Sequence, residues 1–294
     1  MLKKSLSLIA MTSYLAITTL ESSFAEEKKS SDELKDGSQK KFLIGVNTSK
    51  ISLNHNLHDK DSSKQKTDGY SLGVELKYKI FDKENYFNSI EGSDLFFSYE
   101  LSKLTGENIM FDYESKSYDI LKITGLTGHD IRLGTDIDFD GYKNITPSIR
   151  LGGFYKKFNS ENINYFGSND LLNYTINFTN RFQGAILGTK ISHKSDNNEN
   201  VLIADFYPYV KYKGSIDFIN DNCHLNLKDK TPGMGFKIGL EHHFKISKQN
   251  LKIFSSYEYI KMKQLKYKNL EEGEEISKVN SLFNSLNMGI GLYF

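Results

Sequence analysis

Apolar residues recur at every second position through most of this chain, and this alternation limits its fold more than any other feature. It is clearest in residues 282–294, where Leu286, Met288 and Ile290 alternate with small or polar residues. A period of two places successive side chains on opposite faces of a β-strand. A strand with one apolar face and one small or polar face suits the wall of a transmembrane barrel. The edge of a soluble β-sandwich has the same pattern, so the rest of the chain must separate the two folds.

Ten segments of this kind follow one another. Each has ten or more residues, which matches the roughly 9 to 11 that a tilted strand needs to cross a bilayer. We therefore predict an all-β fold, an antiparallel up-and-down transmembrane β-barrel of about ten strands, within a range of about eight to twelve. The segments are residues 42–53, 70–80, 94–104, 130–140, 145–157, 182–193, 201–213, 233–246, 251–262 and 282–294.

Connections between the segments alternate between long and short. Outer-membrane barrels have short periplasmic turns and longer extracellular loops. We expect the long connections outside the cell, and both termini with the short turns in the periplasm. A soluble lipocalin-like barrel has less reason to segregate its loops in this way. The long connections are residues 54–69, 105–129, 158–181, 214–232 and 263–281, and the short ones are 81–93, 141–144, 195–199 and 247–250.

The first 25 residues have the organisation of a secretion signal. Lys3 and Lys4 form a basic region, an apolar stretch follows, and small residues precede a cleavage site after Ala25. We predict a signal peptide over residues 1–25, a flexible periplasmic segment over 26–41 and the barrel over 42–294. The cleaved chain has 36 basic and 36 acidic residues, a balance that gives no reason to expect a nucleic-acid partner.

The second face of the alternating segments carries charges of both signs. A ten-stranded barrel is only a little wider than the eight-stranded barrels that side chains fill. The charged residues are expected either to plug the lumen as a salt-bridged network or to line a narrow aqueous path. No ring of one sign dominates, so no ion selectivity follows. The lumen candidates are Glu75, Lys77, Lys79, Glu100, Arg132, Asp136, Asp138, Arg150, Lys156, Lys190, Lys237 and Glu241.

No pattern typical of catalysis, metal binding or cofactor binding is found, and we predict no enzyme activity. Ten-stranded outer-membrane proteases carry an Asp-x-His near the outer rim, a motif that this sequence lacks. His129 and Asp130 are adjacent, and so are His242 and His243, and neighbours in a strand point to opposite faces. His193 begins a His-x-Ser that faintly resembles that of lipid A deacylases, but it lies at a predicted periplasmic turn.

Aromatic residues gather near the predicted strand ends, where the girdles of a membrane barrel lie. Examples are Tyr70, Tyr78, Tyr207 and Tyr209. Pro208 lies between two of them, and a proline inside a strand indicates an edge or a bulge.

The C-terminal segment resembles the assembly signal of outer-membrane barrels. Asn287, Gly289, Leu292 and the terminal Phe294 occupy the positions of its polar, glycine, apolar and aromatic residues. The resemblance implies outer-membrane lipid and the barrel assembly machinery as partners. If the barrel closes, this strand pairs with residues 42–53.

Several segments also resemble the major surface antigens of the Anaplasmataceae, the rickettsial outer-membrane protein family. These segments are residues 118–127, 145–154, 182–188 and 289–294. The resemblance implies a surface antigen of the outer membrane with porin-like passive transport of small solutes, and sometimes adhesion to host cells. One alternative is an adhesin whose barrel only anchors host-binding loops. A third hypothesis is a hydrolase at the outer rim.

Overall fold

The computed structural model describes most of the chain from residue 40 onward. The described residues are 40–56, 62–82, 90–112, 117–142, 144–166, 175–195, 198–218, 223–229, 232–246, 249–269 and 275–293. The predicted signal peptide with Ala25, residues 26–39 and Phe294 lie outside them.

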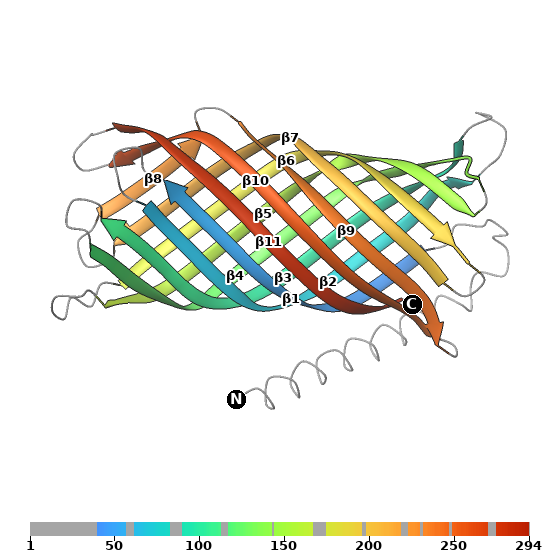
Figure 1. Cartoon of the computed structure of the whole chain (residues 1–294), viewed down its shortest axis with the longest axis horizontal. Helices are drawn as coiled ribbons and strands as arrows, with labels where there is room; N and C mark the ends of the chain where they lie inside the picture. The colour runs from blue at the N-terminus through green and yellow to red at the C-terminus, as the bar shows by residue number, and fades with distance from the viewer. Residues whose placement is uncertain are drawn as a thin grey trace, which may run out of the picture. The chain divides into compact units, whose positions relative to one another are not determined.

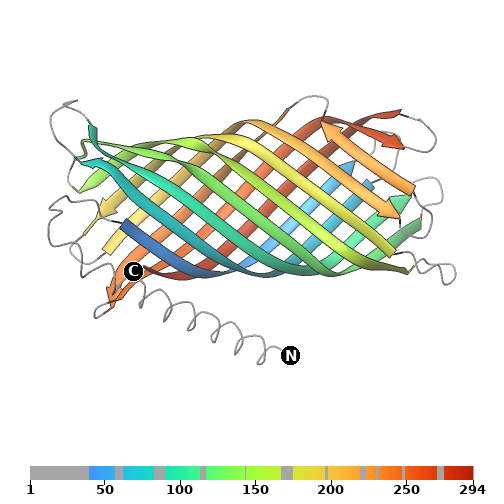
Figure 2. The ribbon, with the colours of Figure 1, turned by 180° about the vertical axis from the view of Figure 1, so that it is seen from behind.

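These residues form a closed, all-antiparallel β-barrel of ten strand positions, as the sequence predicts (Figures 1 and 2). Two of the eleven strands, β8 and β9, share one position, because both lie between β7 and β10. Among the described residues, no helix has the length and apolar character to cross a membrane. The strands are β1 (Lys40–Asn56), β2 (Ser62–Asp82), β3 (Ile90–Asp112), β4 (Ser117–Phe139), β5 (Ile145–Phe166), β6 (Thr175–Lys194), β7 (Asn198–Phe218), β8 (Cys223–Asp229), β9 (Gly233–Ile246), β10 (Gln249–Asn269) and β11 (Glu275–Tyr293).

The first and last strands close the barrel. β1 pairs with β11 from Leu43 opposite Tyr293 to Asn56 opposite Asn280, which confirms the predicted partner of the C-terminal strand. The stagger of the barrel is found by stepping from each residue to its direct partner on the next strand. A path that starts at Tyr78 of β2 and goes once around the barrel returns to β2 at Lys66, twelve residues from its start. With ten strands about 4.8 Å apart, this stagger gives a tilt of about 40° and a radius of about 10 Å.

β1 starts and β11 stops at one end of the barrel, called here the turn end, and the opposite end is called the hairpin end. At the turn end, β4 and β5 are joined by a tight turn in which Asn144 has a φ of 66°. In Figure 1 the hairpin end is at the left, where the arrow of β1 points.

An apolar band covers the outward face. Along β9, the outward residues from Met234 to Ile246 rise about 30 Å along the barrel axis, at about 2.5 Å per residue for this tilt. A band of about this height, with aromatic residues at its borders, is typical of a wall that faces hydrocarbon. Its exposed members include Tyr70, Leu72, Leu76, Tyr78, Leu95, Leu101, Leu133, Ile149, Leu151, Leu187, Ile191, Leu202, Phe206, Phe236, Ile238, Leu240, Ile253, Tyr257, Leu286, Met288 and Ile290.

The predicted long connections are wrong in large part, because the strands continue through them. β3 and β4 extend to within a few residues of each other, at Asp112 and Ser117, and residues 118–126 belong to β4. The sequence misleads here because the two faces exchange their polarity near the hairpin end. There Lys103 and Arg181 face outward, while Leu104 and Phe182 face the lumen.

One predicted girdle residue, Tyr207, is wrong because β7 contains a bulge. The register of β7 against β9 shifts between Tyr207 and Val210, so Pro208 lies in a bulge that tolerates its missing N–H. The extra residue reverses which positions face inward. Tyr209 stays outward and 41% exposed, but Tyr207 is fully buried in the lumen and is not part of a girdle.

Candidate functional site

An apolar plug fills the lumen near the hairpin end. Its side chains come from eight of the ten strand positions and form one packed cluster. Phe283 of β11 meets Phe158 and Phe182, on the far wall, at ring-centroid distances of 5.9 and 5.2 Å. Side chains that line a water path keep exposed surface, and the central members of this plug have almost none. The cluster comprises Leu53, Leu104, Leu126, Phe154, Phe158, Phe178, Phe182, Ile186, Tyr207, Val210, Tyr212, Ile260, Met262 and Phe283.

Below the plug, on its turn-end side, an ion-pair network crosses the lumen. Glu258 of β10 is 1% exposed and lies 2.9 Å from Arg132 Nη2 of β4 and 2.8 Å from Lys156 Nζ of β5. Tyr207 donates a hydrogen bond of 2.8 Å to Glu258 and accepts one of 2.7 Å from Arg132. Asp130 also pairs with Arg132 and Lys156, so the network contains two acids and two bases. The network has no net charge and joins opposite walls of the barrel.

A second layer of ion pairs lies nearer the turn end. Asp136 lies 2.9 Å from Arg150 Nε and 3.1 Å from Lys190 Nζ. On the other side of the lumen, Lys252 Nζ lies 2.9 Å from Glu75 and 2.7 Å from Glu241. These pairs use both signs, so no ring of a single charge forms in this layer.

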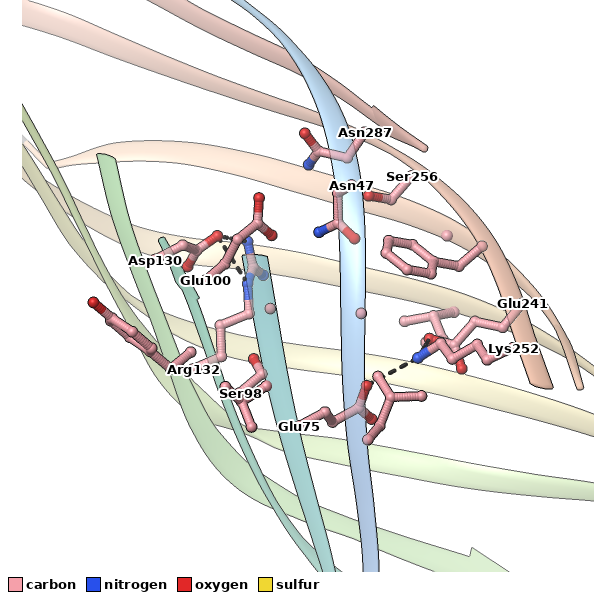
Figure 3. Close-up of a pocket in the computed structure, with 18 of the residues that line it drawn as sticks. Asn47, Glu75, Ser98, Glu100, Asp130, Arg132, Glu241, Lys252, Ser256 and Asn287 are labelled. Atoms are coloured by element: carbon pink, nitrogen blue, oxygen red, sulfur yellow. Dashed lines mark hydrogen bonds and ion pairs between the residues drawn. The ribbon is translucent and has the colours of Figure 1, made fainter. Parts of the chain in front are cut away.

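A cavity of about 110 Å³ separates parts of the two layers. Figure 3 shows the ion pairs Asp130–Arg132 and Glu75–Lys252 at its walls. Glu100 and Lys237 also line it, and neither makes an ion pair or hydrogen bond with a described residue. This volume holds several water molecules but is below the roughly 300 to 1,000 Å³ of small-molecule sites.

At the turn end, the lumen opens into a polar vestibule of about 470 Å³, lined by Lys77, Lys79, Asp94 and His243 among others. His243 stacks on Tyr293 at 5.2 Å and lies 3.0 Å from Glu241. A solute entering from this end would therefore meet charged and aromatic walls and then the plug.

The residues that the sequence singles out for the lumen all lie on the inward face. Lys77 and Lys79 line the vestibule, and Lys156 belongs to the network around Glu258. The second ion-pair layer contains Asp136, Asp138, Arg150 and Lys190. The others line the central cavity: Glu75, Glu100, Arg132, Lys237 and Glu241. Sequence reasoning missed Asp130, Tyr207, Lys252 and Glu258 as lumen residues. Strand parity could have found Lys252 and Glu258, since they alternate with the outward Ile253 and Tyr257.

In the C-terminal segment, Asn287 and Gly289 face the lumen and Leu292 lies on the outward face. Asn287 lines the central cavity (Figure 3). A Cβ on Gly289 would lie 2.4 Å from Asn47 Oδ1, so only glycine fits there without movement of its neighbour.

The histidines considered for hydrolysis do not meet. His129 faces outward near the hairpin end, 3.0 Å from the Tyr99 hydroxyl, and His193 faces outward at the turn end. In the part of the chain that the structure describes, no three His, Cys, Asp or Glu side chains are grouped to hold a metal.

No protein-family model matches the chain, and no curated protein matches it. Among solved structures, the outer membrane protease OmpT from Escherichia coli aligns with a TM-score of 0.66 and 8% identity, over 90% of this chain and all of that chain. The transport unit of the autotransporter AIDA-I from E. coli aligns with a TM-score of 0.39 and 13% identity, over 90% of this chain and 93% of that one. The translocator domain of NalP from Neisseria meningitidis aligns at 0.37 and 8%, over 95% and 97%.

The likeness to OmpT shows a shared barrel fold. At this identity it carries no activity across, and the expectation that the chain is not an enzyme stays a prediction. The resemblance to rickettsial surface antigens also stays a hypothesis.

Proposed function

We propose that the chain is an outer-membrane barrel that is closed to solutes and serves as a rigid anchor for the strands and hairpins at its hairpin end. Two features support insertion in the membrane. The outward wall is an apolar band of about 30 Å. Among the described strands, the pairing of β1 with β11 closes the barrel and leaves no free edge in hydrocarbon.

The plug is the observation that carries the proposal. With a radius of about 10 Å at the backbone, aromatic side chains from opposite walls reach each other, and Phe158, Phe182 and Phe283 do so. A porin-like path would need this cluster to move. The plug therefore favours the adhesin or surface-antigen hypothesis over the porin hypothesis, with host-cell surfaces or other environmental molecules as partners.

A second candidate, passage of small ions, is favoured by one observation. Below the plug, the lumen is polar and contains the cavity between the ion-pair layers, where Glu100 and Lys237 make no ion pair with another described residue. Opening of the plug would connect this cavity to the hairpin end.

Orientation is part of the proposal, with the hairpin end outside and both termini in the periplasm. A tag inserted near Asn222, in the β7–β8 connection, is expected to be labelled on intact cells, and a tag near Asn198 only after permeabilisation. Reversed labelling would overturn the orientation.

The function at the hairpin end is tested by replacing each hairpin tip with a short Gly-Ser turn. Variants that still fold, judged by the heat-dependent shift in gel mobility of membrane barrels, are compared in attachment to host cells. Loss of attachment in at least one folded variant is expected. Full attachment by every variant would contradict an anchoring role.

A further inference from the structure

The outward face carries a belt of cations directly above the apolar band at the hairpin end. The strand register and the tilt give the height of each residue along the barrel axis. The six members of the belt lie within about two residues, or about 5 Å, of the same height. The belt consists of Lys50, Lys103, Lys157, Arg181, Lys211 and Lys261.

Three cations at this end are directly paired across strands. Lys157 of β5 lies opposite Arg181 of β6, and Arg181 lies opposite Lys213 of β7. Like charges directly opposite each other destabilise a sheet. None of the three makes an ion pair with a described residue, and Arg181 and Lys213 are exposed.

Among the side chains that the structure describes, no acid faces this row. The nearest outward side chains along the three strands and across to β4 are His129, Tyr155, Asn159, Thr179, Gln183, Lys211 and Ser215, none of which carries a carboxylate. On the β8 side, the residue directly opposite Lys213 is Lys228, another cation. The row therefore has a net charge of about +3, and no described carboxylate neutralises it.

A groove of about 480 Å³ lies immediately below the row on the lipid-facing wall. Tyr155, Gln183 and Tyr209 form its upper part, and Leu133 and Ile131 lie along it. Gly153 leaves the groove open, and a Cβ added there would meet only the Gly184 carbonyl oxygen, at 3.4 Å. An apolar groove that ends at a cationic row fits an acyl chain whose head group carries the anion.

We propose that the row Lys157–Arg181–Lys213 and the groove beneath it bind a lipid whose head group carries an exposed phosphate, in the leaflet at the hairpin end. This proposal rests on the proposed membrane insertion. The phosphate lies across the three cations, and an acyl chain occupies the groove beside Gly153. Tyr155 and Tyr209 lie at the depth where chain and head group meet.

The test uses the full chain purified from membranes in a zwitterionic detergent, with dimyristoyl phosphatidic acid, dimyristoyl phosphatidylcholine and inorganic phosphate as probes. Phosphatidic acid is expected to bind more tightly than the other two. The variant K157Q/R181Q/K213Q should lose about a hundredfold in affinity, since each cation near a charged surface contributes about fivefold. The matched control K50Q/K66Q/K103Q removes three exposed cations from β1–β3 and should lose less than about fivefold.

The groove is tested separately by Gly153→Leu, which should weaken phosphatidic acid about tenfold and leave inorganic phosphate unchanged. Without any phosphate compound, the row variant should unfold at a higher temperature than wild type, because like-charge repulsion is gone. If both triple variants lost the same affinity for phosphatidic acid, binding would be due to the general positive charge of the belt and not to this row. That result would overturn the proposal. Unchanged phosphatidic acid binding in G153L would show that the groove holds no acyl chain. The lipid proposal would then be wrong, and the row would be a site for anions only. Because the experiment is done in detergent, its failure is separable from failure of the surface-labelling test.

Discussion

Replacement of Glu258 by Gln should destabilise the barrel more than any conservative substitution on its outer wall. Glu258 is 1% exposed and accepts hydrogen bonds from Arg132, Tyr207 and Ser285, and its other close cation is Lys156. Gln keeps the shape but removes the charge, and the network then holds two bases and one acid. Breaking a buried ion pair from one side costs about 3–5 kcal/mol. We expect a loss of about 3 kcal/mol, because the amide oxygen still accepts some of these bonds.

The assay is urea unfolding in detergent or lipid vesicles. Since the chain has no Trp, unfolding is followed by far-UV circular dichroism and by gel mobility of unheated samples. Lys261→Gln is the matched control, because Lys261 is exposed on the same strand, and it should change stability by less than about 0.5 kcal/mol.

A second substitution separates the ion pair from simple loss of packing. In K156M/E258Q, Arg132 and Asp130 are left as a neutral pair. The double variant should therefore be more stable than the two single losses predict, by about 2 kcal/mol. A Glu258→Gln variant within about 0.5 kcal/mol of wild type, or additive losses in the double variant, would refute the cross-barrel network as a stabilising element.

Three further predictions concern assembly. Gly134→Val should prevent formation of the folded, fast-migrating species, because a Cβ there would lie 2.3 Å from a carbonyl oxygen of β5, while Gly153→Ala should fold; equal yields would contradict the tight β4–β5 wall. In a chain with its native cysteine replaced by Ser, Thr48→Cys and Met288→Cys should form a disulfide, because these residues are direct partners across the closing seam; absence of the cross-link in the folded species would contradict the register. Deletion of Phe294 should lower the amount of folded barrel in the membrane, and normal assembly without it would argue against the C-terminal signal.

The number of strands and the residues of the lipid-facing wall could be predicted because alternation is strongest where one face is apolar. The strand ends could not. Between the band and the hairpin end, the apolar residues lie on the inward face and form the plug, as with Leu104 and Phe283. The outward face there carries basic residues. The segments where the two faces exchange polarity have the composition of polar loops, although strand pairing continues through them.

The inward position of charged residues could also be predicted, but their partners could not. Glu258 and Arg132 are 126 residues apart in the chain and meet only because β10 and β4 lie on opposite walls. Regular alternation predicts Tyr207 on the same face as Tyr209, but the bulge at Pro208 places the two on opposite faces. Such a bulge changes the phase of alternation by one residue, which the pattern alone does not locate.

The most direct test of the closed barrel is single-channel recording in planar lipid bilayers. Wild-type protein, shown to be inserted and folded, is predicted to give no discrete conductance steps. A variant with Phe158, Phe182 and Phe283 replaced by Ala should give steps, because it removes the rings that meet across the lumen. Stable, uniform steps from the wild-type protein would contradict the account, since the apolar plug would then not close the barrel.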